Sequence, residues 1–227
     1  MALQPTLRPF IIAGNPDAPH TLDIFLDYVC PFSAKIALII DSVLRPAFAP
    51  GGKYAGKVKV IFRQQVQPWH GSSTFVHEAG LAVARVAPDR FWDFSLALFE
   101  GQGEFFDIPT SNLTPTQIRE KLADLAGTVI GPDKVAAVKD LLTNKTSPNG
   151  GVDVTNDLKY TSAYFLSLLL TNIETDAGNV AHIVKFSRQN SIHVSPTVLW
   201  DGLVASEISS SWGEKEWEEF LVNKILV

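Results

Sequence analysis

Cysteine is almost absent from this sequence, which holds one such residue, Cys30, among 227. A single cysteine excludes an intramolecular disulfide, and with it every small fold that depends on disulfide crosslinks for its stability. A chain without disulfides is typical of a reducing compartment. We therefore expect a cytoplasmic protein. Residues Met1–Pro9 agree, because they lack the charged-then-apolar pattern of a secretory signal.

Long hydrophobic runs and an excess of positive charge are also missing. No stretch approaches the ~20 continuous apolar residues that span a bilayer, so we expect no membrane partner. Lys and Arg number 19 against 24 for Asp and Glu, which gives a net charge of -5. Binding to a nucleic-acid backbone needs clustered positive charge, and no Lys/Arg cluster is present. We therefore expect no nucleic-acid partner.

The sequence instead has the composition of an ordered soluble protein, with 46% hydrophobic and 19% charged residues. Leu22–Val29 is apolar enough for a buried strand, and Ala34–Leu44 has the pattern of a helix. Between them lie Cys30 and Pro31, and proline is favoured in the first turn of a helix. Cys30 should therefore lie at a helix N-terminus, where free N–H groups favour a nucleophilic thiolate. The alternative is a buried, inert cysteine.

The remaining segments predict strands at both ends of the chain and helices between them. Leu7–Ile12 and Val58–Val66 read as strands, the second parallel to Leu22–Val29 through a right-handed crossover. Helices are expected at Thr74–Val86, Phe91–Phe99, Thr114–Ala126, Asp133–Leu142, Asn156–Thr171, Ala177–Gln189 and Gly213–Leu221, and a hairpin at Val194–Trp200 and Leu203–Glu207. We expect an α/β core in two parts, residues 1–72 and 173–227, with an all-helical insertion at 73–172.

This order of elements and two motifs resemble the DsbA-like branch of the thioredoxin superfamily. The motifs are Cys30-Pro-Phe-Ser33 and Val194-Ser-Pro196-Thr. The resemblance implies a thioredoxin-like βαβ…ββα core with a helical insertion. It also implies that Cys30 is the attacking cysteine and that Pro31 and Phe32 border the bound substrate.

The resemblance further implies roles for the second motif. Pro196 would follow a cis peptide bond, and Ser195 would pair through its backbone with an extended substrate or with glutathione. A cis bond before proline costs little compared with other cis bonds. The alternative is an ordinary trans proline at the start of a strand.

The main departure from the family pattern is Ser33, which stands where disulfide-forming members have a second cysteine. Cys30 can therefore form a mixed disulfide but cannot release it by internal attack. Monothiol chemistry remains, with glutathione as the external thiol and co-substrate. The Ser33 hydroxyl either donates a hydrogen bond to the thiolate or is simply a small polar helix residue.

Two further functions stay open. Kappa-class glutathione transferases and 2-hydroxychromene-2-carboxylate isomerases share this fold, but they typically have serine at the position of Cys30. Such an enzyme would act on an electrophilic substrate with glutathione. The other option is a redox-inactive module that binds peptides. Partners are thus glutathione or a disulfide-bearing or electrophilic substrate, and a homodimer is compatible with each function.

Residues Gln64–Glu78 should emerge beside Cys30, because they follow the second strand of the sheet. Trp69 either walls a groove or belongs to the core. His70 is a candidate proton shuttle, because its ordinary pKa lies near neutrality. Surface or capping positions are the alternative for His70 and His77, and their spacing does not support a metal site.

The residues just before Cys30 and the start of the first insertion helix carry further expectations. Asp23 or Asp27 is a candidate buried proton acceptor, although we expect Asp27 to face solvent or cap a turn. Tyr28 and Phe32 border the cysteine and are candidates for contact with an apolar substrate. Ser73 or Thr74 should cap the first insertion helix, with Glu78 near its first turn.

Overall fold

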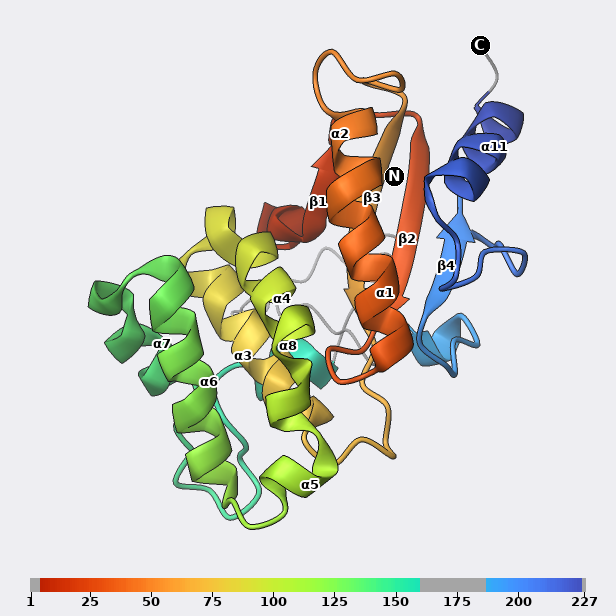
Figure 1. The fold of residues 1–227 in the computed structure, drawn as a ribbon. Coiled ribbons are helices and arrows are strands. Elements are labelled where there is room, and N and C mark those ends of the chain that lie inside the picture. The colour runs from red at the N-terminus through yellow and green to blue at the C-terminus, as the bar shows by residue number, and fades with distance from the viewer. Residues whose placement is uncertain (1–4, 160–186, 226–227) are drawn as a thin grey trace, which may run out of the picture.

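The computed structural model describes residues 5–159 and 187–225, which form a mixed α/β fold around one sheet (Figure 1). The sheet has five strands in the order β1-β3-β2-β4-β5. These strands are β1 Ile11–Gly14, β2 His20–Leu26, β3 Val58–Gln64, β4 Thr197–Trp200 and β5 Leu203–Val204. β2 runs parallel to β3 and antiparallel to β4. This is the predicted thioredoxin-like arrangement.

The N-terminal strand differs from the prediction. A strand was expected at Leu7–Ile12, but Pro5–Phe10 is a 3-10 helix and β1 begins at Ile11. Pro9 lies inside this short helix. Proline has no N–H to donate to a strand ladder, so the apolar segment pairs with β3 only from residues that follow Pro9. β1 then lies antiparallel to β3 at the edge of the sheet.

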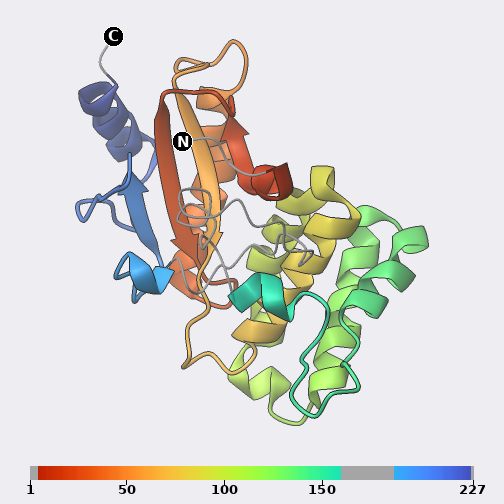
Figure 2. The same ribbon diagram turned by 180° about the vertical axis from the view of Figure 1, so that it is seen from behind.

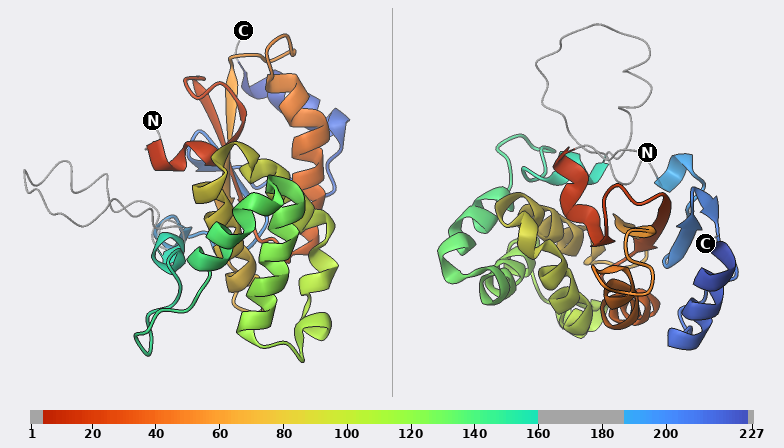
Figure 3. Two further views of the ribbon diagram at one scale, coloured as in Figure 1. Left: turned by 90° about the vertical axis from the view of Figure 1, so that its left-hand side faces the viewer. Right: turned by 90° about the horizontal axis from the view of Figure 1, so that it is seen from above.

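The helix expected at Ala34–Leu44 begins three residues earlier, at Pro31, and continues beyond Leu44. α1 spans Pro31–Ile39, a π-helical turn follows at Ile40–Leu44, and α2 covers Arg45–Phe48. Figure 1 shows these segments as one continuous rod. α11, Glu214–Lys224, lies on the same face of the sheet as α1 and α2, and both views of Figure 3 show this. The N-terminus of α1 lies at the end of the sheet where β2 and β3 finish.

Between β3 and β4, residues 73–159 form helices and no strand. They are α3 Ser73–Val86, α4 Phe91–Glu100, α5 Asp107–Thr110, α6 Pro115–Ile130, α7 Val135–Leu141 and α8 Thr155–Lys159. α6 starts with a capping box formed by Thr114 and Gln117. Figure 2 shows the helices gathered beside one end of the sheet. Most of the helices expected at Asn156–Thr171 and Ala177–Gln189 lies outside the described residues. None of the described helices has the length and apolar character needed to cross a membrane.

The insertion and the sheet share one hydrophobic core. The Phe62 ring on β3 contacts the rings of Tyr28, Phe91, Trp92 and Phe99, with centroids 5.4 to 6.1 Å apart. Tyr28 was expected to border a substrate, but it is fully buried and its hydroxyl lies 2.8 Å from Ser95 Oγ. Burial raises the pKa of Tyr28 well above its ordinary value. The insertion is thus packed onto the sheet rather than set apart from it.

Replacing Phe62 by alanine should lower the free energy of unfolding by about 3 to 5 kcal/mol, because it empties the centre of this aromatic cluster. Denaturant unfolding measures the change. Phe32→Ala is the control, since that ring is 55% exposed and its removal leaves no cavity. Equal losses for both variants would contradict a shared core centred on Phe62.

Candidate functional site

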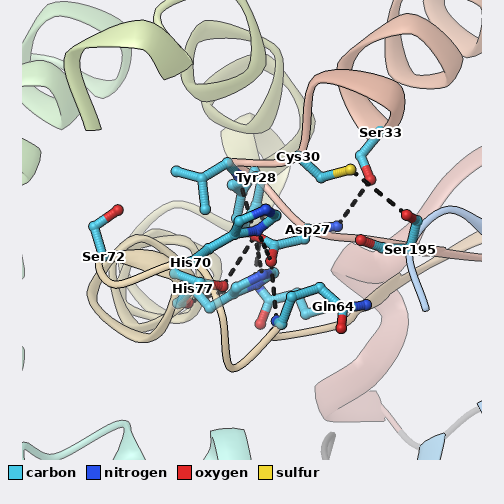
Figure 4. Close-up of polar contacts among 12 residues, drawn as sticks. Asp27, Tyr28, Cys30, Ser33, Gln64, His70, Ser72, His77 and Ser195 are labelled. Atoms are coloured by element: carbon cyan, nitrogen blue, oxygen red, sulfur yellow. Dashed lines mark hydrogen bonds and ion pairs between the residues drawn. The ribbon is translucent and has the colours of Figure 1, made fainter. Parts of the chain in front are cut away.

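Cys30 is the N-cap residue of α1, with φ -88° and ψ 119°, and Pro31 occupies the first turn. The prediction that Cys30 lies at a helix N-terminus is confirmed. Its side chain is nearly buried, at 5% exposure, and the thiol donates a hydrogen bond to Ser195 O over 3.5 Å (Figure 4). The Ser195–Pro196 peptide bond is cis. The chain thus brings the two predicted motifs together, although they lie 165 residues apart.

Ser33, one turn along α1, is fully buried. Its Oγ accepts a hydrogen bond from Asp27 N over 3.1 Å. Among the described residues, no hydrogen bond joins Ser33 Oγ to Cys30 Sγ. The hydroxyl therefore ties the start of the helix to the loop that precedes Cys30, which agrees with a structural role for Ser33.

Asp27 lies in that loop and is completely buried, so it does not face solvent. As expected, its side chain caps a turn. Its Oδ1 accepts from Val29 N at 3.0 Å and Ser73 Oγ at 2.9 Å. Its Oδ2 accepts from Gln67 N and is hydrogen bonded to His70 Nδ1, both at 2.9 Å. Burial disfavours the charged form and by itself would raise the pKa of Asp27. The contacts with His77, the Val29 N–H and His70 lower the pKa and outweigh the effect of burial. Together they lower the pKa of Asp27 to about 2.

The two histidines occupy different depths around Asp27 (Figure 4). His70 is partly exposed, and its Nδ1 faces the carboxylate, which leaves Nε2 as its second ring nitrogen. A surface or capping position was one expectation for His77, but it is fully buried against the ring of Tyr28, with centroids 4.7 Å apart. Its Nε2 lies 3.5 Å from Asp27 Oδ1, and neither ring nitrogen makes a hydrogen bond of normal geometry. No local sequence pattern indicates this burial, because the contacts come from distant segments.

Three exposed apolar side chains lie on the segments around Cys30. Phe32 is 55%, Trp69 59% and Val194 55% exposed. Phe32 belongs to the start of α1, Trp69 to the loop after β3 and Val194 to the loop before Pro196. Hydrogen bonds link these three segments. Trp69 therefore does not belong to the core. Each of the three segments thus exposes one apolar side chain.

Two buried glutamines near the site were missed by the sequence analysis. Gln102 Nε2, from the insertion, donates to Tyr28 O at 2.9 Å and to Cys30 O at 3.4 Å. The Gln67 amide accepts from Ser195 N at 2.7 Å and donates to His193 O at 3.2 Å, in the orientation that satisfies both partners. A polar residue in a loop is usually exposed, so no sequence signal separates these two from ordinary surface glutamines.

The start of α3 also differs from the prediction. Its N-cap is Ser72, whose hydroxyl donates to Phe105 O, while Ser73 donates to Asp27. Glu78 does not reach back to the first turn, because it is buried in contact with Arg119 and Thr155. Asp23, the other candidate acceptor, pairs with Arg63. No cluster of three metal-binding side chains occurs in residues 5–159 and 187–225.

Asp27→Asn should lower the free energy of unfolding at neutral pH by about 2 kcal/mol, the equivalent of a pKa lowered from 3.8 to about 2. Because the folded-state pKa is the lower one, this contribution is complete above pH ~4 and disappears as the pH falls towards ~2. Denaturant unfolding of both proteins across this range measures it. Asp201→Asn, which breaks a more exposed Asp–His pair, is the control. A difference that stays constant down to the lowest pH would refute the assignment.

The model of the thioredoxin family matches residues 8–221. No curated protein matches the sequence. A protein-disulfide isomerase candidate from Pseudomonas syringae has a TM-score of 0.60 at 24% identity, covering 93% of this chain and 97% of its own. Oxidised BdbD from Bacillus subtilis has a TM-score of 0.56 at 23% identity, covering 99% and 97%.

DsbA from Chlamydia trachomatis has a TM-score of 0.56 at 13% identity, with 98% and 93% of the two chains covered. At these identities the three likenesses show the fold, which is that of DsbA-like thiol-disulfide oxidoreductases. The sequence match to the family model is independent of them and covers nearly the whole chain. The chain therefore belongs to the thioredoxin family.

Proposed function

We propose that this protein catalyses thiol–disulfide exchange with Cys30 as its only nucleophile. The observation that carries the proposal is the position of Cys30 at the N-terminus of α1, with its thiol against Ser195 O in the loop that precedes Pro196. Free N–H groups in the first turn of a helix favour a thiolate. The sulfur is thus placed to attack a disulfide that enters between the apolar side chains of Phe32, Trp69 and Val194.

The exchange needs two steps. In the first, the Cys30 thiolate attacks one sulfur of the substrate disulfide, that S–S bond breaks, and the released thiolate takes a proton from solvent. In the second, an external thiolate attacks the substrate sulfur of the mixed disulfide and returns Cys30 as a thiolate. Glutathione is the proposed external thiol, because Ser33 carries no sulfur and glutathione is the abundant thiol of the reducing cytosol, the location that we propose for this protein.

We propose that His70 is the base that accepts the proton of the entering thiol. Asp27 Oδ2 is hydrogen bonded to Nδ1, which leaves the partly exposed Nε2 as the nitrogen that would accept the proton. The exposed side chains of Phe32, Trp69 and Val194 favour substrates with apolar groups beside the disulfide. The Ser195 carbonyl, which receives the Cys30 thiol in the resting protein, becomes available once the sulfur has reacted.

Wild-type protein should form a mixed disulfide with glutathione disulfide, reversed by added glutathione, and Cys30→Ser should form none. Intact mass and the rate of exchange measure both. Glutathione-dependent turnover of an electrophile that survives in Cys30→Ser would instead favour a transferase or isomerase. Binding of extended peptides without any thiol reaction would favour a redox-inactive binding module.

His70→Gln should slow the release of glutathione from Cys30 by about tenfold at neutral pH, because the entering thiol loses its base. The deficit should shrink as the pH rises and the thiol ionises without help. His20→Gln is a matched control, since His20 also pairs through Nδ1 with a carboxylate, Asp201, at 2.8 Å, but at the start of β2. Equal effects of the two variants, or a deficit that does not change with pH, would rule out a proton-transfer role for His70.

A further inference from the structure

The Gln67 side chain links the loop after β3 to the loop that precedes Pro196. It is almost fully buried, and its amide accepts from Ser195 N at 2.7 Å while donating to His193 O at 3.2 Å. The reverse orientation would set oxygen against oxygen and nitrogen against nitrogen, so the partners fix the amide. The Gln67 backbone is held as well, by its N–H to Asp27 Oδ2.

These two main-chain groups are the ones that an added parallel strand would use. His193 O and Ser195 N bracket Val194, and in a parallel ladder one neighbouring residue donates to the first and accepts from the second. A glutamine side chain carries the same donor and acceptor as a peptide unit. Gln67 therefore satisfies, from within the chain, both groups with which a parallel extended substrate would pair, and it also occupies Ser195 N against an antiparallel one.

The two polar groups of the Ser195 main chain differ in what happens during the reaction. Ser195 O receives the Cys30 thiol, and that bond is lost once the thiol ionises and the sulfur enters a mixed disulfide. Ser195 N stays bonded to Gln67, because the amide takes no part in the chemistry. The sulfur site is thus open to a disulfide while the neighbouring main chain stays occupied.

We propose that Gln67 determines substrate specificity by occupying His193 O and Ser195 N against the main chain of an extended peptide. The inference rests on the proposed thiol–disulfide exchange at Cys30 and specifies the substrate class. The protein selects disulfides held by their sulfur and by apolar groups at Phe32, Trp69 and Val194. Peptides that depend on main-chain pairing must first displace the glutamine.

The test compares two disulfides, one without amide groups and one with a peptide main chain. Hydroxyethyl disulfide is the first, and the disulfide-linked dimer of a blocked alanine pentapeptide with a central cysteine is the second. The rate at which each forms a mixed disulfide with Cys30 is measured by intact mass. Gln67→Met keeps the volume but removes both hydrogen bonds. It should raise the peptide-to-hydroxyethyl rate ratio about tenfold, as two hydrogen bonds become available to the peptide.

Gln64→Met is the matched control, because the Gln64 amide bonds Tyr28 Oη and His77 O rather than the loop before Pro196. Its rate ratio should equal that of the wild type. If Gln67→Met is too unstable to study, Gln67→Glu should give a smaller rise, since it frees only His193 O. An unchanged or lower ratio in the Gln67 variants, or equal slowing of both probes, would overturn the proposal.

Binding of the same pentapeptide with serine in place of cysteine separates the two hypotheses. Tighter binding to Gln67→Met than to the wild type supports the role of Gln67 without any sulfur chemistry. Failure of the wild-type Cys30 to react with either disulfide would overturn the proposed function, whereas equal binding by both proteins would overturn the role of Gln67.

Discussion

The site depends on one buried carboxylate. Asp27 accepts hydrogen bonds from the loop before Cys30, from the loop after β3 and from the first turn of α3, so three segments meet on two oxygen atoms. A buried negative charge is tolerated only when it is fully hydrogen bonded or paired, and these contacts together with His70 and His77 meet that requirement. Removing the charge would leave several polar groups without a partner at once. The hydrogen bonds to Asp27 thus hold the loop that positions Cys30.

The local parts of this arrangement could be predicted from the sequence. The apolar run before Cys30 and the proline after it indicated the strand, the helix and the place of the sulfur between them, because those signals lie within a few residues. The first strand was predicted four residues too early, because an apolar pattern does not show where strand pairing can begin after a proline such as Pro9. Family resemblance, rather than periodicity, connected Cys30 with Pro196.

The polar interior of the site could not be predicted in this way. Asp27 meets Gln67 40 residues further along the chain, and Gln102 reaches Tyr28 O across 74 residues. Sequence alone gives the residue type but not the partner, so a buried aspartate and a surface aspartate look alike. The same holds for His77, whose burial follows from the packing of α3 against Tyr28. The continuous core explains these contacts, because it brings the insertion against the loop that carries Cys30.

Ser33 has a consequence for the energetics of any redox cycle. Because the chain holds one sulfur that can be oxidised in this way, it has no dithiol–disulfide couple of its own and hence no intramolecular midpoint potential. It cannot store an oxidising equivalent as an internal disulfide between encounters with substrate. Under the proposed exchange, the ratio of thiol to disulfide in the surroundings sets the direction of the reaction, and the protein sets only its rate and its choice of partner.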